Sequence, residues 1–206
     1  MGLAIARQFA GNGFSIALLS RTVSSLEGLV ATLAAEGYRA EAFTADVLDR
    51  PSIVAALTRV EERLGPIDLL EYSPSSAGSR VPPTEVTVEN AQEQLEFYVY
   101  GAITAVQHVL PTMLERGNGT IIVTTGASSV YPNATFGNVA LAAAALRNWA
   151  LSLHAAVGEH GVQVGHVAIN AWLGHQPGAE AELVAPLYWK LHTGRDIAEL
   201  VFAPAD

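Results

Sequence analysis

The feature that most constrains this chain is the regular alternation of short apolar runs with longer segments of helical spacing. Apolar runs of strand length fall at residues 14–20, 39–47, 67–73, 119–129 and 162–170, and a shorter one at 198–204 is expected at a sheet edge. Segments with helical spacing lie at residues 2–13, 22–37, 49–65, 88–115, 136–160 and 181–194. This alternation predicts an α/β fold: a doubly wound parallel sheet with helices on both faces.

Length and composition are those of one globular domain. The chain has 206 residues, half of them hydrophobic, so we expect a single domain over residues 1–206. No apolar run reaches the roughly 18 residues of a membrane span. The sequence has no cysteine and its start lacks the order of a signal peptide, so we expect a cytoplasmic protein. A net charge of −9 with a single lysine argues against nucleic-acid binding.

Four polar segments end or follow the predicted strand stretches, where a parallel α/β sheet binds its ligand. They are "SRT" at residues 20–22, "ADV" at 45–47, "EYSPSS" at 71–76 and "TTGASS" at 124–129. The carboxyl ends of parallel strands meet at one edge of a sheet, beside the point where the strand order reverses. We therefore expect these segments to border a site for a small-molecule substrate.

The order and spacing of the segments resemble those of the short-chain dehydrogenase/reductase family. The matching pieces are "LLSRT", "TADVLD", "LGPIDLLEYSPSSAG", "GAITAVQHVLPTMLERGNGTIIVTTGASS" and "AALRNWALSL", which together cover essentially the whole chain. The resemblance implies a Rossmann-like fold, NADP or NAD as the cofactor, and oxidation or reduction of a small apolar alcohol or carbonyl.

The resemblance also indicates that the family's first strand, and most of the Gly-rich turn after it, are absent. Met1 and Gly2 match the end of that turn, so Gly2 is expected at the cofactor's pyrophosphate. In the strand order 3-2-1-4-5-6 the lost strand is the central one, and its neighbours would carry unpaired backbone groups. Two explanations are open. Either about 10–15 further residues precede Met1 in the natural protein, or the sheet re-pairs.

Five more residues are expected at the cofactor by the same resemblance. They are Ser20, Arg21, Asp46, Val47 and Ser73. An arginine at the position of Arg21 accommodates the 2′-phosphate of NADP, so NADP is the preferred cofactor. Two other readings stay open: Arg21 as a solvated cation after a strand, and Asp46 as the N-cap of the following helix.

The catalytic positions of the family are mostly substituted. Family members use a Tyr, a Lys one helical turn later, a Ser and an Asn. The Tyr and Lys positions hold Val139 and Ala143, and the chain's single lysine, Lys190, lies elsewhere. The Asn position holds Tyr98, which we interpret as a packing residue. The Ser position is Ala127, or Ser128 if one gap is allowed.

Other hydroxyl groups could replace the missing ones. The candidate catalytic residues are Ser128 and Ser129, in the small-residue loop that ends the stretch at 119–129, and Tyr131 just after it. Both serines also suit turn and capping roles. Trp172 is expected to form a wall for an apolar ligand. His108, His154 and His166 are interpreted as core or interface histidines rather than ligands, and no cluster has metal-ligand spacing.

Two hypotheses remain. The first is an NADP(H)-linked oxidoreductase with a non-standard active site. The second is a non-redox protein of the same fold, either a pseudo-enzyme, a binding or partner subunit, or an enzyme using the apolar pocket for other chemistry. The resemblance also implies a homodimer or homotetramer through the two long helices, and the small residues of the segment at 136–160 suit such close helix contact.

Overall fold

The computed structural model describes residues 1–75 and 78–204, and these contain the predicted alternation. The strands are β1 (Ile16–Ser20), β2 (Ala40–Thr44), β3 (Leu69–Tyr72), β4 (Gly119–Gly126), β5 (Val162–Ile169) and β6 (Glu199–Phe202). The α-helices are α1 (Gly2–Ala10), α2 (Ser24–Ala35), α3 (Arg50–Leu64), α4 (Val88–Leu95), α5 (Gly101–Arg116), α6 (Gly137–Val157) and α7 (Ala181–Thr193). The predicted α/β class is confirmed.

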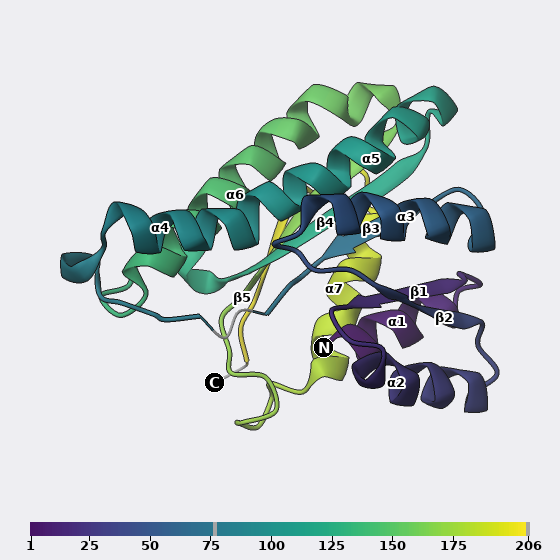
Figure 1. Ribbon diagram of the computed structural model, residues 1–206, viewed down its shortest axis with the longest axis horizontal. Helices are drawn as coiled ribbons and strands as arrows, with labels where there is room; N and C mark the ends of the chain where they lie inside the picture. Colours follow the sequence, from purple (N-terminus) through teal and green to yellow (C-terminus); the bar gives the residue numbers. More distant parts are fainter. Residues whose placement is uncertain (76–77, 205–206) are drawn as a thin grey trace.

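The strands form two parallel sheets. One contains β1 and β2, and the other has the order β3-β4-β5-β6, with β6 at its edge as predicted. Figure 1 shows the smaller sheet, with α1 and α2, below and to the right of the larger one. Within the described residues β1 and β3 do not pair, so the sheet has not re-paired in the way the sequence left open. Each of these two strands keeps one edge without a ladder partner.

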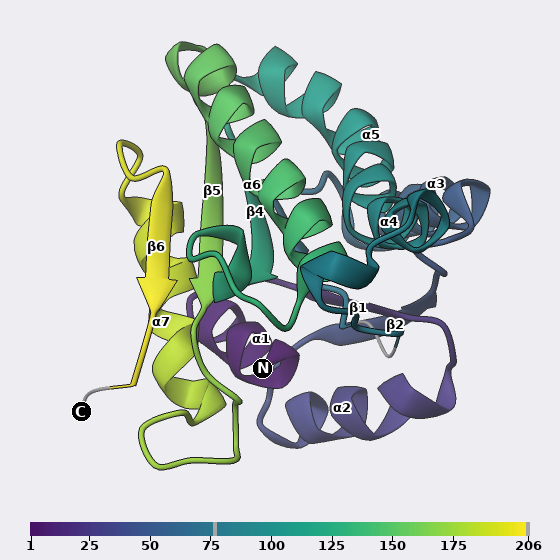
Figure 2. The ribbon, with the colours of Figure 1, turned by 90° about the vertical axis from the view of Figure 1, so that its left-hand side faces the viewer.

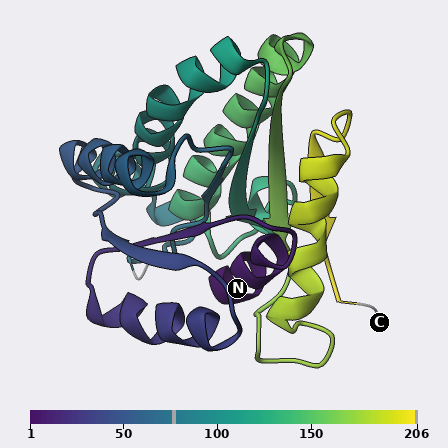
Figure 3. The ribbon, with the colours of Figure 1, turned by 90° about the vertical axis from the view of Figure 1, so that its right-hand side faces the viewer.

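Helices cover both faces of the larger sheet. One core lies between its first face and α3, α5 and α6, which carry buried residues such as Leu57, Val109 and Leu146. Figure 2 shows α5 and α6 side by side over β4 and β5. The second core joins the other face to α1 and α7, which pack against each other (Figure 3) around residues such as Phe9 and Tyr188. No helix in the described ranges is long and apolar enough to cross a bilayer.

The long helix expected at residues 88–115 is not a uniform α-helix. A π-helical segment, η2 (Glu96–Tyr100), separates α4 from α5. The helix begins with a capping box between Thr87 and Asn90 and ends at Gly117, whose φ of 60° is left-handed. A π turn shifts the side chains after it around the helix axis and is often found at functional sites. Here it carries Tyr98.

Candidate functional site

A pocket of about 480 Å³ lies at the carboxyl ends of β4 and β5. Its lining comes from residues 126–128 and 131–133 after β4, 169–172 and 176 after β5, 136 and 139 around the start of α6, and from Arg80 and Tyr98. This is the sheet edge at which the sequence predicts a ligand, and Trp172 is part of the wall as expected.

Of the three candidate catalytic residues, two line the pocket and one is buried behind it. Ser128 and Tyr131 line the pocket. Ser129 does not: it ends the short helix η3 (Ala127–Ser129) and is buried behind the lining. The prediction of a catalytic role therefore stays open for Ser128 and Tyr131, whereas Ser129 is placed to hold the loop.

Helix α6 brings no proton-transferring side chain to the pocket. Val139 lines it, and Ala143, one turn later, is 1% exposed and packed in the interior. The adjacent Asn138 is fully buried and is engaged by backbone groups of Ser79 and Val81.

Tyr98 lines the pocket, although the sequence led us to interpret it only as a packing residue. Its ring packs against the core as expected, yet it also lines the pocket. Burial raises the pKa of Tyr98, an effect opposed by the nearby positive charge of Arg80. The phenol therefore stays protonated at neutral pH and can donate a hydrogen bond. The π turn that positions it has no signature in the sequence.

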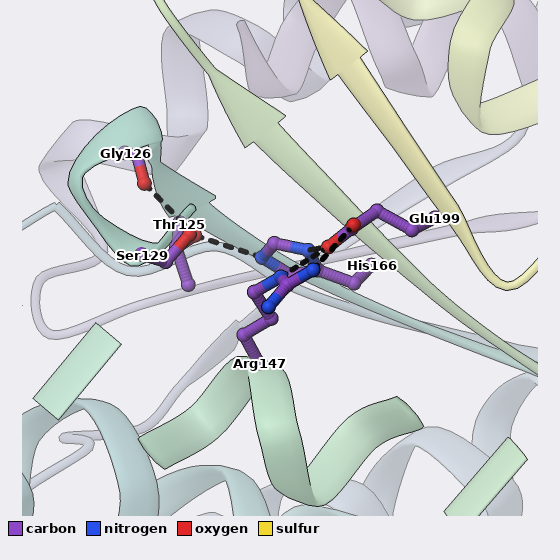
Figure 4. A network of polar contacts seen from close by, with 6 residues as sticks. All are labelled: Thr125, Gly126, Ser129, Arg147, His166 and Glu199. Carbon is purple, nitrogen blue, oxygen red and sulfur yellow. Dashed lines mark hydrogen bonds and ion pairs between the residues drawn. The ribbon is translucent and has the colours of Figure 1, made fainter. Parts of the chain in front are cut away.

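Behind the pocket wall, a chain of polar contacts connects β4, β5, β6 and α6 (Figure 4). Thr125 Oγ1 lies 2.7 Å from Ser129 Oγ and 2.8 Å from His166 Nε2. His166 Nδ1 is 2.8 Å from a Glu199 oxygen, and the guanidinium of Arg147 donates to both oxygens of that carboxylate. These contacts fix the loop after β4 from behind.

The ionisation of this chain follows from its surroundings. Burial lowers the pKa of His166, which is fully buried, and so favours the neutral ring. The hydrogen bonds from Arg147 lower the pKa of Glu199. Because an ionised carboxylate only accepts, the Nδ1 of His166 must donate to it. The interpretation of His166 as a satisfied core histidine is confirmed.

The residues predicted at the cofactor lie at helix and strand ends. Gly2 is the first residue of α1, whose N-terminus has no side-chain cap. Ser20 ends β1, and its hydroxyl lies 2.9 Å from that of Ser25. Arg21 follows, is exposed to solvent, and makes no hydrogen bond or ion pair within the described part of the chain.

Residues after β2 differ from one open reading of the sequence. Asp46 is not the N-cap of α3, since Asp49 holds that position and its side chain accepts from the Ser52 N–H. Asp46 Oδ1 instead accepts from the Leu48 N–H in a local turn. Val47 packs against the main core. Asp46 forms an Asx turn rather than capping α3 because it lies ahead of Asp49, the residue at the N-cap position.

Ser73, expected at the cofactor, is engaged by an acid on its own strand. Its hydroxyl donates to Glu71 Oε2 at 2.9 Å, and Thr124 Oγ1 donates to Oε1 at 3.1 Å. Burial outweighs these bonds and raises the pKa of Glu71 to about 7. No sequence pattern indicated this perturbed acid, which lies on β3, a strand with a ladder partner on one side only among the described residues.

Comparison with curated proteins finds several relatives. The chain is 35% identical over 124 residues to the 2,3-dihydro-2,3-dihydroxybenzoate dehydrogenase of Bacillus subtilis, covering 59% of this chain and 46% of that protein. It is 24% identical over 168 residues to the gluconate 5-dehydrogenase of Gluconobacter oxydans, covering 82% and 65%. The chain thus spans between 46% and 65% of the length of these relatives.

Solved structures share the fold. The L-sorbose reductase of Gluconobacter frateurii, complexed with NADPH and L-sorbose, superposes with a TM-score of 0.88 at 23% identity, covering 99% of this chain and 91% of that one. A gluconate 5-dehydrogenase from Burkholderia cenocepacia, in complex with NADP and tartrate, gives 0.85 at 20% identity, covering 98% and 88%.

Parallel strands with helices on both faces, and a pocket at the strands' carboxyl ends, define a Rossmann-like α/β protein. Within this broad class, the sequence also identifies a particular family. The family model for short chain dehydrogenases matches residues 1–172, and the chain belongs to that family.

Proposed function

We propose that this protein is an NADP(H)-linked oxidoreductase acting on a small carbonyl or alcohol, with hydroxyl groups of the pocket in place of the usual Tyr and Lys. The observation that carries the proposal is the pocket itself. It lies where the fold binds ligands, and Tyr98, Ser128 and Tyr131 are its hydroxyl-bearing residues.

The residues present fit an NADP cofactor. Arg21, directly after β1, has no ion-pair partner among the described residues, as a 2′-phosphate ligand would require. The uncapped N-terminus of α1 at Gly2 offers backbone N–H groups to a pyrophosphate. Two similar structures were solved with NADP or NADPH. NADPH supplies the hydride when it is bound.

The chain's own residues would orient the substrate and donate hydrogen bonds. Ser128 and the neutral phenol of Tyr98 can both donate to a carbonyl oxygen, which stabilises negative charge as it develops there. Val139 gives that wall an apolar surface and moves no proton. Without a matched general acid, a term of roughly 10²–10⁴-fold in rate is lost, so we expect slow turnover.

The test is NADPH oxidation across a panel of ketones and quinones. The unmodified protein should be slow, and Ser128→Ala combined with Tyr131→Phe should reduce its rate by at least about tenfold. The matched control is Tyr100→Phe, which changes a tyrosine of the π-helical segment η2 that lies outside the pocket lining. Rates typical of the family in the unmodified protein, or an unchanged rate in the double variant, would contradict the proposal.

A further inference from the structure

We propose that Arg80 recognises a carboxylate, so that the substrate is a small carbonyl or alcohol that also bears an acid group. The inference rests on the proposed function and names the substrate class of the same pocket. It departs from the apolar ligand that the sequence led us to expect, because Arg80 is the one charged residue among the described residues that line the pocket.

Arg80 lacks the partners that most other arginines have. Within the described part of the chain it forms no hydrogen bond or ion pair, and Arg21 is alone in sharing this property. The remaining arginines all donate to a carboxylate, an amide or a backbone carbonyl: Arg7, Arg39, Arg50, Arg59, Arg63, Arg116, Arg147 and Arg195. A pocket cation left unpaired in a chain of net charge −9 is available to an anionic ligand.

Two aromatic rings hold the guanidinium in place. Its central carbon lies 5.3 Å from the ring centroid of Trp172 and 5.8 Å from that of Phe136. The two rings are themselves in edge contact, with centroids 6.3 Å apart. Such cation–π contacts orient a guanidinium while its N–H groups keep their hydrogen-bonding capacity.

The backbone on both sides of Arg80 is anchored to the start of α6. The buried Asn138 donates from Nδ2 to the Ser79 carbonyl at 3.0 Å and accepts from the Val81 N–H at 3.1 Å. The Gly137 N–H donates to the Val81 carbonyl at 2.7 Å. A recognition residue between two anchored neighbours loses little entropy when a ligand binds.

Gly137 allows this close approach. A Cβ at this position would lie 2.6 Å from backbone atoms of Pro83, a distance that side chains do not tolerate. The loop can therefore lie directly on the helix only because a glycine stands there. The arrangement brings Arg80 into the same pocket as Ser128 and Tyr98, the groups assigned to the carbonyl end of the substrate.

A carboxylate matches this site better than a phosphate ester. One planar guanidinium can bind both oxygens of a carboxylate and balances its single charge. A phosphate ester carries more charge at neutral pH, and the part of the lining that the structure describes offers no second cation. The ligand would thus have its acid group at Arg80 and its reacting carbon toward the loop after β4.

Calorimetric binding of 4-acetylbenzoate and its neutral isostere 4-acetylbenzamide tests the inference, with and without NADP⁺, which cannot reduce either ketone. The acid should bind about 10–100-fold more tightly than the amide. Arg80→Gln should abolish the difference, and Arg80→Lys should keep only part of it because the planar fork is lost. Lys190→Gln, which removes one exposed positive charge away from the pocket lining, is the matched control and should leave the acid preference unchanged. Acetophenone phosphate esters serve as the other anion and should bind more weakly than the acid.

Equal affinity for acid and amide, or a preference that survives Arg80→Gln, would overturn the inference. Because binding is measured without turnover, its failure is separate from that of the proposed function. An acid preference in a protein that never oxidises NADPH would contradict the redox proposal and support Arg80 as a carboxylate site.

Discussion

At the scale of single residues, two arginines carry the recognition proposed for this protein. Arg21 lies directly after β1, and Arg80 lines the pocket at the carboxyl ends of β4 and β5. Neither is paired within the described residues. An arginine whose charge nothing in the fold neutralises is more informative than one in a surface ion pair, since most such pairs contribute little.

Arg21→Ala should remove a preference for NADPH over NADH. The lost charge-assisted contact with the 2′-phosphate is expected to cost about 1.5–3 kcal/mol of NADPH binding and to leave NADH binding nearly unchanged. Fluorescence titration of both nucleotides checks this. Equal affinities in the unmodified protein would refute the assignment of Arg21.

Glu71 should make stability depend on pH. Burial raises its folded-state pKa to about 7, whereas a carboxyl in an unfolded chain titrates near ~4.3. Between those values the folded protein holds a proton that the unfolded chain releases. The stabilisation is therefore complete below the unfolded pKa and is lost as the pH rises through about 7.

The variant Glu71→Gln has no such proton to lose. Between pH 5 and pH 8 the unmodified protein should lose up to roughly 3 kcal/mol in free energy of unfolding relative to this variant. Urea unfolding at both pH values measures the difference. Glu62→Gln, at an exposed position of α3, is the control and should follow the unmodified protein. Parallel pH profiles for Glu71→Gln and the unmodified protein would show that Glu71 is not the titrating group.

At the scale of elements, patterns in the sequence predicted the strands and helices, but they predicted only part of the candidate site. Apolar runs and helical spacing predicted every main element because both depend on neighbours in sequence. The lining by Ser128, Tyr131 and Trp172 also followed, since these residues come directly after strands. The π turn under Tyr98 left no pattern. The contacts from Thr125 through His166 to Glu199 join positions far apart in sequence, so periodicity could not indicate them.

Restoring the family's Tyr and Lys on α6 should not produce a good enzyme. Ala143 is 1% exposed, so Ala143→Lys would bury an unpaired charge and destabilise the fold by more than about 2 kcal/mol. Val139→Tyr alone, at the pocket wall, should be tolerated better. Thermal unfolding and NADPH oxidation of both single variants and the double variant test this. A stable, fast double variant would show that the remaining positions are sufficient.

At the scale of the whole molecule, the two sheets leave β1 and β3 each with one edge that no strand in residues 1–75 and 78–204 pairs with. A chain lengthened before Met1 by an apolar strand and a Gly-rich turn should pair with both edges. Each ladder hydrogen bond contributes about 1 kcal/mol, so the free energy of unfolding should rise by several kcal/mol. The control is the same extension with a proline at the centre of its strand. Equal urea midpoints for the two extended chains would rule out such pairing.

The central claim, hydride transfer in a site without the usual Tyr and Lys, is tested most directly by isotope transfer. The protein is incubated with 4-acetylbenzoate and NADPH carrying deuterium at the transferring C4 position, and the product alcohol is analysed by mass spectrometry. We predict that deuterium appears on the carbinol carbon, slowly, and at a rate at least about tenfold lower in the Ser128→Ala/Tyr131→Phe variant. Bound cofactor and bound ketone with no deuterated alcohol would contradict the account and favour a non-redox protein.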